Sequence, residues 1–366
     1  MKALAADGRP SLLGLDPEAL EVCLAGLGEP ERGRRLRARQ LFHWLYHRGA
    51  ASFETMTTLP RELRSRLADT YSVARPDIVT EQRSADGTRK WLLRFADGQE
   101  VESVFIPEDD RGALCVSTQV GCTLTCSFCH TGTMPLVRNL GAPEIVAQML
   151  VARDSLDEWP TGRAGRLFTN VVVMGMGEPL LNYDATVAAL RLALDEHGLN
   201  LSRRRITVST SGVVPRIEQL GADLGVGLAI SLHAVRDELR DELVPINRKW
   251  NIAALLDACR RYPARRPTTF EYVMLQGAND SDADARELVR LLRGISAKVN
   301  LIPFNAWPGA PYTCSSSNRI HAFAQIVEDA GYASPVRTPR GRDILAACGQ
   351  LKTESQRLRR RLATAA

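Results

Sequence analysis

From residue 113 onward, short apolar runs alternate with longer segments whose apolar residues recur at helical spacing. The apolar runs predict strands at 114–118, 170–174, 205–210, 226–232, 268–274 and 298–302. The amphipathic segments predict helices that include 185–197, 252–262, 283–292 and 319–330. This alternation implies βαβ units and therefore a parallel sheet, either open or curved into a barrel. In both architectures the functional site lies at the carboxyl ends of the strands.

The region before the alternating segment follows two other patterns. Helical spacing predicts helices at 16–27, 37–47 and 61–71. Residues 78–107 then contain three strand-like runs separated by Asp86-Gly87 and Asp97-Gly98, which predicts a small antiparallel meander. We therefore expect a helical accessory domain that binds RNA (1–74), a β meander leading into the core (75–110), the core (111–346) and a C-terminal tail (347–366).

The chain of 366 residues has no apolar run long enough to cross a bilayer. Its first ten residues lack the apolar stretch of a secretory signal peptide, so we expect a cytoplasmic protein with no membrane partner. Thiols stay reduced in that compartment. The eight cysteines are therefore better explained as metal ligands or reactive thiols than as a disulfide framework.

Arginines gather in three places along this mildly basic chain, whose net charge is +5. The groups lie within 32–39, 203–205 and 357–361. Each group alone is explained by a solvated helix face. Three groups in one protein favour a polyanionic partner, because Lys and Arg neutralise phosphates and release counterions.

The cysteine motif Cys122-Thr-Leu-Thr-Cys126-Ser-Phe-Cys129 directly follows the first strand of the alternating region. Iron–sulfur clusters are held by cysteine thiolates, normally four for a [4Fe–4S] cluster. Three cysteines on one loop leave one iron open for a substrate. This spacing, with an aromatic residue before the last cysteine, resembles the signature of radical S-adenosylmethionine (SAM) enzymes.

Three other interpretations of the cysteines remain. Zinc could bind three cysteines and His130, although the adjacent Cys129 and His130 fit poorly into one tetrahedron. The sequence from Cys126 to His130 also matches a haem attachment motif, which belongs to exported proteins and leaves Cys122 unexplained. The third interpretation is that the cysteines are simply buried in the core. We favour the iron–sulfur cluster.

A second motif, Gly175-Met176-Gly177-Glu178-Pro179, follows the predicted strand at 170–174. Glycines let the backbone approach a ligand closely, and the carboxylate of Glu178 is suited to accept a hydrogen bond from the ammonium group of SAM. The motif resembles the GGEP element of radical SAM proteins.

The chain as a whole resembles the RlmN/Cfr family of radical SAM RNA methyltransferases. The likeness covers nearly the whole chain, through segments 39–46, 101–108, 114–122, 208–212, 230–233, 243–247, 300–305, 308–311 and 347–351. Its longer N-terminal region is more similar to the RlmN branch, which acts on both 23S rRNA and tRNA, than to the shorter Cfr branch. For the fold, the resemblance implies an α/β protein with a partial (βα)6 TIM-like radical SAM barrel, an N-terminal helical accessory domain and a small β meander.

The resemblance also implies a reaction. The RlmN-type enzyme methylates C2 of adenosine in the peptidyl-transferase region of 23S rRNA and in tRNA, just 3′ of the anticodon. It uses a [4Fe–4S] cluster, held here by Cys122, Cys126 and Cys129, and two molecules of SAM per turnover. By resemblance Cys348 carries the methyl group, Cys115 releases the product through a transient disulfide, and Glu102 is the proton acceptor. Taken singly, these three residues are better explained as a tail thiol, a buried strand residue and a surface acid. Only the presence of all three in matching context favours the catalytic roles.

Further SAM contacts are implied by the same likeness. They fall on Gly177, Glu178, Ser209, Ser231, Leu232, His233 and Asn305. His233 is alternatively a core histidine with its hydrogen bonds satisfied. The expected partners are 23S rRNA, tRNA and a reductant protein such as flavodoxin, and the expected state is a monomer. The competing hypotheses are a Cfr-type adenosine C8 methyltransferase with the same cysteines and a noncatalytic iron–sulfur protein that binds RNA.

Overall fold

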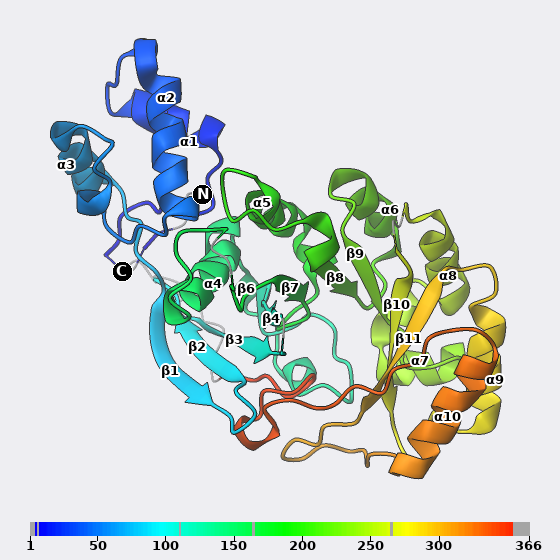
Figure 1. The fold of residues 1–366 in the computed structure, drawn as a ribbon. Coiled ribbons are helices and arrows are strands. Elements are labelled where there is room, and N and C mark those ends of the chain that lie inside the picture. The colour runs from blue at the N-terminus through cyan, green and yellow to red at the C-terminus, as the bar shows by residue number, and fades with distance from the viewer. Residues whose placement is uncertain (1–3, 6, 110, 163–164, 264–265, 354–366) are drawn as a thin grey trace, which may run out of the picture.

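The computed structural model describes residues 4–353 except for 6, 110, 163–164 and 264–265. Its main element is a nine-stranded sheet in the order β1-β2-β3-β4-β7-β8-β9-β10-β11 (Figure 1). Among the described residues β1 and β11 are the two edges of this sheet, so it does not close on itself. No helix in the described part of the chain is long and apolar enough to span a membrane.

Six neighbouring strands of this sheet are parallel, as the alternating sequence pattern predicts. They are β4 (Gly112–Cys115), β7 (Asn170–Val173), β8 (Ile206–Thr210), β9 (Gly227–Ser231), β10 (Thr268–Met274) and β11 (Ala297–Pro303). Every residue of β10 is buried, as expected of a strand covered on both faces. The predicted partial (βα)6 barrel is therefore confirmed.

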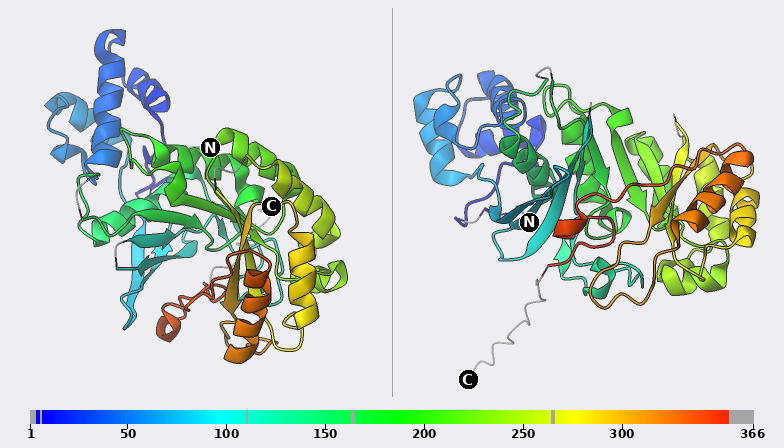
Figure 2. Two further views of the ribbon diagram at one scale, coloured as in Figure 1. Left: turned by 45° about the vertical axis from the view of Figure 1, so that its right-hand side comes forward. Right: turned by 60° about the horizontal axis from the view of Figure 1, so that its bottom comes forward.

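Helices cover the outer face of the curved parallel sheet (Figure 2). They are α4 (Ala142–Ser155), α5 (Tyr183–Leu194), α6 (Val214–Asp223), α7 (Asp237–Leu243), α8 (Ile252–Arg261), α9 (Asp282–Leu291) and α10 (Ser317–Asp329). Short 3-10 turns accompany them at η3 (Thr131–Thr133), η4 (Pro179–Asn182), η5 (Arg203–Arg205), η6 (Pro245–Arg248) and η7 (Arg342–Ile344). The loops that follow the strands lie on the inner side of the curved sheet.

The predicted meander extends the parallel sheet. Its strands are β1 (Asp77–Arg83), β2 (Arg89–Arg94) and β3 (Glu100–Pro107), and both turns contain a glycine with positive φ, Gly87 and Gly98. β3 pairs antiparallel with β4, where Val104 lies opposite Cys115. The meander thus lies directly beside the first strand of the core.

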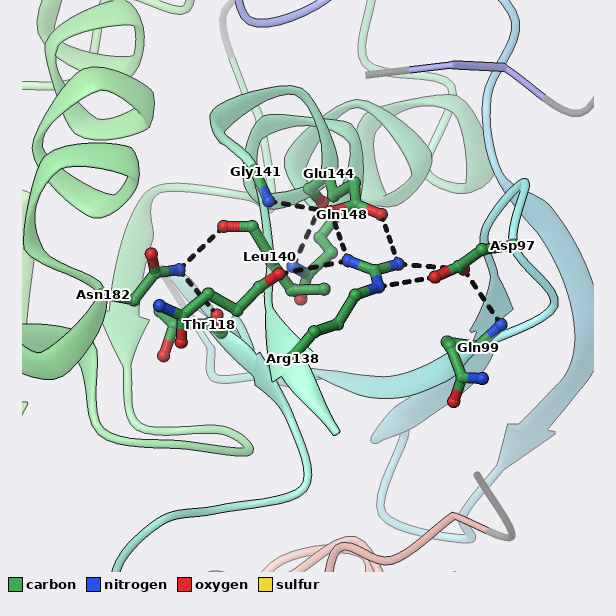
Figure 3. A network of polar contacts seen from close by, with 10 residues as sticks. Asp97, Gln99, Thr118, Arg138, Leu140, Gly141, Glu144, Gln148 and Asn182 are labelled. Atoms are coloured by element: carbon green, nitrogen blue, oxygen red, sulfur yellow. Dashed lines mark hydrogen bonds and ion pairs between the residues drawn. The ribbon is translucent and has the colours of Figure 1, made fainter. Parts of the chain in front are cut away.

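Arg138 ties the meander to the core from a small second sheet made of β5 (Gln119–Val120) and β6 (Arg138–Asn139). Its guanidinium lies 2.6 Å from Asp97 in the β2–β3 turn and 2.8 Å from Glu144 on α4 (Figure 3). Glu144 also accepts a 2.8 Å hydrogen bond from the N–H of Gly141 at the start of α4. These contacts fix the segment that follows the cysteine loop.

The accessory helices lie at one end of the molecule (Figure 1). They are α1 (Pro17–Gly26), α2 (Glu31–Phe42), the π-helix η1 (His43–His47), the 3-10 turn η2 (Phe53–Thr55) and α3 (Arg61–Thr70). Asp16 caps α1 by accepting a 2.8 Å hydrogen bond from the N–H of Ala19. The arginine group at 357–361 and residues 354–366 of the predicted tail lie outside the described residues.

Candidate active site

A cavity of about 1000 Å³, counted to its open mouth, lies at the carboxyl ends of the parallel strands. Most of the residues that the sequence singles out line it together. These are Cys122, Cys126, Cys129, Gly177, Glu178, Ser209, Ser231, His233, Asn305 and Cys348. Leu232, Cys115 and Glu102 do not line this cavity.

The loop that carries the three cysteines is tightly turned. Gly121 has a φ of +76°, and a Cβ there would lie 2.1 Å from the carbonyl oxygen of Pro135. A Cβ on Gly132 would lie 2.5 Å from the carbonyl oxygen of Cys126. Only glycine fits at these two positions, so the backbone folds back under the thiols.

The three thiols fit a [4Fe–4S] cluster. Burial raises the pKa of Cys122 to about 12 and that of Cys126 well above its usual value, with the neighbouring cysteine charges adding to the effect. Such thiols keep their protons until a cation replaces them. All three thiols line the same cavity, and a [4Fe–4S] cluster takes one thiolate on each of three irons.

His130 does not join the cysteines. Its ring stacks on Trp307 with centroids 4.6 Å apart, and it does not line the cavity. The arrangement therefore disfavours the zinc site with three cysteines and a histidine.

The glycine-rich turn after β7 packs directly against the strand end of β4. A Cβ on Gly175 would lie 2.6 Å from Ser117 Oγ, and one on Gly177, whose φ is +95°, would lie 2.5 Å from Gln119 Cβ. The N–H of Glu178 donates a 2.9 Å hydrogen bond to Gln119 Oε1. Close approach of two backbones thus explains the glycines and aims Glu178 into the cavity.

The carboxylate of Glu178 is buried and bound by backbone N–H groups. It accepts hydrogen bonds of 2.8 Å from Ser211 and 3.1 Å from Leu180. Burial nevertheless raises its pKa to about 7. A cationic ligand group in the cavity would favour the charged carboxylate.

Polar groups on neighbouring strands continue the cavity wall. Ser209 Oγ and Ser231 Oγ lie 3.5 Å apart at the ends of β8 and β9. His233 Nδ1 accepts a 3.1 Å hydrogen bond from the N–H of Val273, and burial lowers the pKa of His233 to about 3, so the ring is neutral. Leu232 lies outside the cavity lining, and its carbonyl oxygen accepts a 3.0 Å hydrogen bond from Arg240.

Cys348 is exposed on the segment that follows α10 and η7 and returns to the cavity. A second, smaller cavity is lined by both Cys348 and the buried Cys115, together with Cys129. Burial, with the charge of Cys348 adding to it, raises the pKa of Cys115 to about 12. The two cysteines are therefore neighbours, beside the third cysteine of the motif.

Glu102 lines neither of these cavities. Its carboxylate lies 2.8 Å from Lys90 Nζ and accepts a 2.9 Å hydrogen bond from the N–H of Lys352. Burial raises its pKa, although Lys90 opposes the shift. Glu102 therefore lies outside these two cavities, and both its carboxylate oxygens have partners there.

Two charged residues of the main cavity were not predicted from the sequence. Arg337 lines the main cavity and two smaller ones together with Cys348, and the charge of the Cys348 thiolate is the main cause that raises the pKa of Arg337. Glu271 lines the main cavity, and its Oε2 is buried without a partner among the described residues. The sequence clue to Glu271 is a charged residue inside an apolar strand. Arg337 follows no recognisable pattern.

Comparison with known proteins matches two family models to the chain. Residues 116–289 match the radical SAM superfamily, and residues 11–73 match the ribosomal RNA large subunit methyltransferase N-terminal domain. The chain is 62% identical, over 96% of its length and 87% of the relative, to a protein named dual-specificity RNA methyltransferase RlmN from Methylorubrum extorquens. A protein of the same name from Azorhizobium caulinodans is 61% identical, over 97% of this chain and 92% of the relative.

A solved structure is also similar. The crystal structure of a radical SAM methyltransferase from Sphaerobacter thermophilus is 49% identical and superposes with a TM-score of 0.87. The match covers 93% of this chain and 99% of the other chain. It therefore includes the accessory helices as well as the core.

Proposed function

This chain belongs to the RlmN family of radical SAM RNA methyltransferases, and we propose that it methylates C2 of adenosine in 23S rRNA and in tRNA. The rRNA target is an adenosine of the peptidyl-transferase region, and the tRNA target is the adenosine just 3′ of the anticodon. The observation that supports this proposal most is that Cys348, Cys115 and Cys129 line one cavity. A methyl-carrying thiol, a thiol that can displace it and a cluster ligand are thereby within one site.

The members of this family bind a [4Fe–4S] cluster and SAM, and this chain does so through its three-cysteine loop. C2 of adenine lies between two ring nitrogens and is electron-poor, so it cannot attack a sulfonium methyl group as a nucleophile. When bound, the cluster and SAM supply a methyl group and a 5′-deoxyadenosyl radical. Glu178, Ser209 and Ser231 line the cavity and would orient these groups there.

Cys348 Sγ, as a thiolate, receives the methyl group, and one hydrogen atom of that group is then taken up into 5′-deoxyadenosine. The sulfur-bound carbon adds to C2 of the adenine, and the adduct loses the C2 proton to a base and one electron, which the oxidised cluster would accept. Cys115 Sγ, as a thiolate, attacks Cys348 Sγ and breaks the bond between that sulfur and the new carbon, which takes up a proton. The two cysteines remain as a disulfide. The raised pKa of Cys115 means that its proton must be removed before the attack.

Glu102 is the expected proton acceptor of this reaction. In that role its carboxylate must exchange its contacts with Lys90 and Lys352 for contacts with the cavity, which it does not line.

The accessory helices are suited to hold RNA. A hollow between them and the loop after α5 is lined by Arg35, Arg39, His43 and His197, with Asp195 and two glutamates of α1 opposing them. The two arginines can contact phosphates, whereas the three carboxylates repel them, so RNA would meet this hollow from the arginine side. The target base must leave its stack to reach Cys348, at a cost of a few kcal/mol.

The expected setting is a monomer in the cytoplasm that receives electrons from a reductant protein such as flavodoxin. Methylation at C8, as in Cfr-type enzymes, would use the same cysteines.

The deciding experiment is to incubate the reconstituted protein, SAM and a reductant separately with an rRNA fragment and with tRNA, and to analyse the nucleosides by mass spectrometry. We expect 2-methyladenosine in both RNAs and none with Cys348→Ala. Appearance of 8-methyladenosine instead would support the Cfr-type reaction, and unmethylated RNA would support the noncatalytic hypothesis.

A further inference from the structure

A buried ion pair on the meander contacts both ends of the segment that carries Cys348. Lys90 Nζ on β2 lies 2.8 Å from Glu102 Oε1 on β3, with side chains only 10% and 8% exposed. Lys90 Nζ also donates a 3.3 Å hydrogen bond to the carbonyl oxygen of Leu345. Glu102 Oε2 accepts its 2.9 Å hydrogen bond from the N–H of Lys352. One ion pair therefore holds residues 345 and 352 at the same place on the sheet.

The tip of this segment is bound from the other side. The N–H of His130, in the cysteine loop, donates a 2.8 Å hydrogen bond to the carbonyl oxygen of Gly349. Asn305, in the loop after β11, donates a 3.3 Å hydrogen bond to the carbonyl oxygen of Cys348. The meander thus contacts the two ends of the segment, and the core contacts its tip. The ribbon of this part of the chain, drawn in red, runs beside the cyan strands of the meander (Figure 2).

The two hydrogen bonds that hold the ends of the segment each have a charged partner from the ion pair. Hydrogen bonds to charged groups are stronger than those between neutral groups. If the segment leaves, Glu102 Oε2 loses the N–H of Lys352, and Lys90 loses the carbonyl oxygen of Leu345. The ion pair therefore favours the conformation in which Cys348 faces the cavity.

We propose that Lys90 and Glu102 are positioning residues that anchor the Cys348 segment, so that the β meander is the docking platform of the methyl-carrying cysteine. The proposal rests on the role proposed above for Cys348. In this role Glu102 keeps the contacts with Lys90 and Lys352 that it makes in the structure. Lys90, which was not predicted from the sequence, acquires a function as the partner of Glu102.

The test is hydrogen–deuterium exchange in the full-length, cluster-loaded protein without RNA or SAM. In the double variant Lys90→Met/Glu102→Met the ion pair is replaced by apolar side chains of similar length, which leaves no unpaired charge in the sheet. We expect amides in 345–353 to exchange about tenfold faster, while those of β8 and β9 keep their wild-type rates. The matched control is Glu81→Met/Arg83→Met, which removes an exposed ion pair of β1 at 2.9 Å. This control should change the exchange rates neither in 345–353 nor in β8 and β9.

Unchanged exchange in 345–353 would overturn the proposal. If the double variant does not fold, Glu102→Gln replaces it, since the amide keeps one acceptor and the shape of the side chain. That variant should raise the exchange in 345–353 by about threefold, and no increase there would also overturn the proposal. Because no methylation is measured, a failure of the proposed C2 chemistry does not affect this result.

Discussion

The N–H of Ser211 donates a 2.8 Å hydrogen bond to the carboxylate of Glu178, so the loop after β8 holds the acid that ends the glycine-rich turn after β7. Both residues line the cavity. Burial outweighs this hydrogen bond and raises the pKa of Glu178 to about 7, from 4.5 for an exposed glutamate. The acid therefore titrates near neutral pH.

The first prediction concerns stability and pH. Since the folded-state pKa of Glu178 is raised, its contribution to stability is fully present below pH 4.5 and is lost as pH rises through about 7. We expect the Tm of the wild type, without cluster or SAM, to fall relative to that of Glu178→Gln as pH rises from about 5 to about 8. Calorimetry on both proteins measures this, with Glu81→Gln on the exposed strand β1 as control. A Tm difference that stays constant over this range would contradict the assignment.

The second prediction concerns Arg240, which is fully buried beneath the cavity. Its guanidinium donates hydrogen bonds of 2.7 Å to the carbonyl oxygen of Ser211 and 3.0 Å to that of Ser231. Arg240→Lys keeps the charge but not the planar fork of donors. We expect a loss of about 3 kcal/mol in the free energy of unfolding, and weaker SAM binding.

Urea unfolding and SAM titration check this second prediction. The control is Arg216→Lys on the exposed side of α6, for which the change in free energy of unfolding should stay within about 0.5 kcal/mol. Equal effects of the two substitutions would rule out a special role for Arg240.

The parallel core is largely predictable from periodicity, whereas α4 is not. Residues from Ile145 to Arg153 are all buried, including Gln148, so α4 has no polar face to mark its helical period. The predicted strand at 114–118 ends early, at Cys115. The N–H of Thr118 instead donates a 2.9 Å hydrogen bond to Met176 in the glycine-rich turn.

Some residues of the candidate site can likewise be predicted from the sequence, and others cannot. Ser209 and Ser231 follow from their places at strand ends, because parallel strands bring their carboxyl ends together. Arg337 and Lys90 cannot be predicted from a position at a strand end. Arg337 reaches Cys348 from a segment outside the named strands, and Lys90 meets Leu345 across 255 positions of sequence. Such contacts depend on the tertiary fold and leave no local pattern.

The third prediction tests the cluster. Cys122→Ala removes one of three thiolate ligands, so protein purified without oxygen should lose its brown colour, its bound iron and all cleavage of SAM. Iron analysis and absorbance measure this. Cys23→Ala, at a buried cysteine of α1, is the matched control and should retain iron. An iron content in Cys122→Ala equal to that of the wild type would exclude the three-cysteine site.

The fourth prediction tests Cys115. Without this thiol nothing displaces the sulfur of Cys348, so Cys115→Ala should purify with RNA covalently attached through Cys348. Denaturing gels before and after nuclease treatment, followed by peptide mass spectrometry, detect the adduct. The double variant Cys115→Ala/Cys348→Ala should carry no RNA. Free and normally methylated RNA as the only product of Cys115→Ala would remove Cys115 from the mechanism.

The most direct test of the account follows the hydrogens of the methyl group. Direct transfer from SAM would move the methyl group with all three hydrogens, whereas the route through Cys348 loses one of them before carbon meets the base. Protein whose Cys348 already carries a deuterated methyl group is allowed to turn over once with RNA and deuterated SAM. Mass spectrometry should find two deuteriums in the methyl group of the RNA and the third in 5′-deoxyadenosine. Three deuteriums retained in the RNA would contradict the methyl-cysteine route.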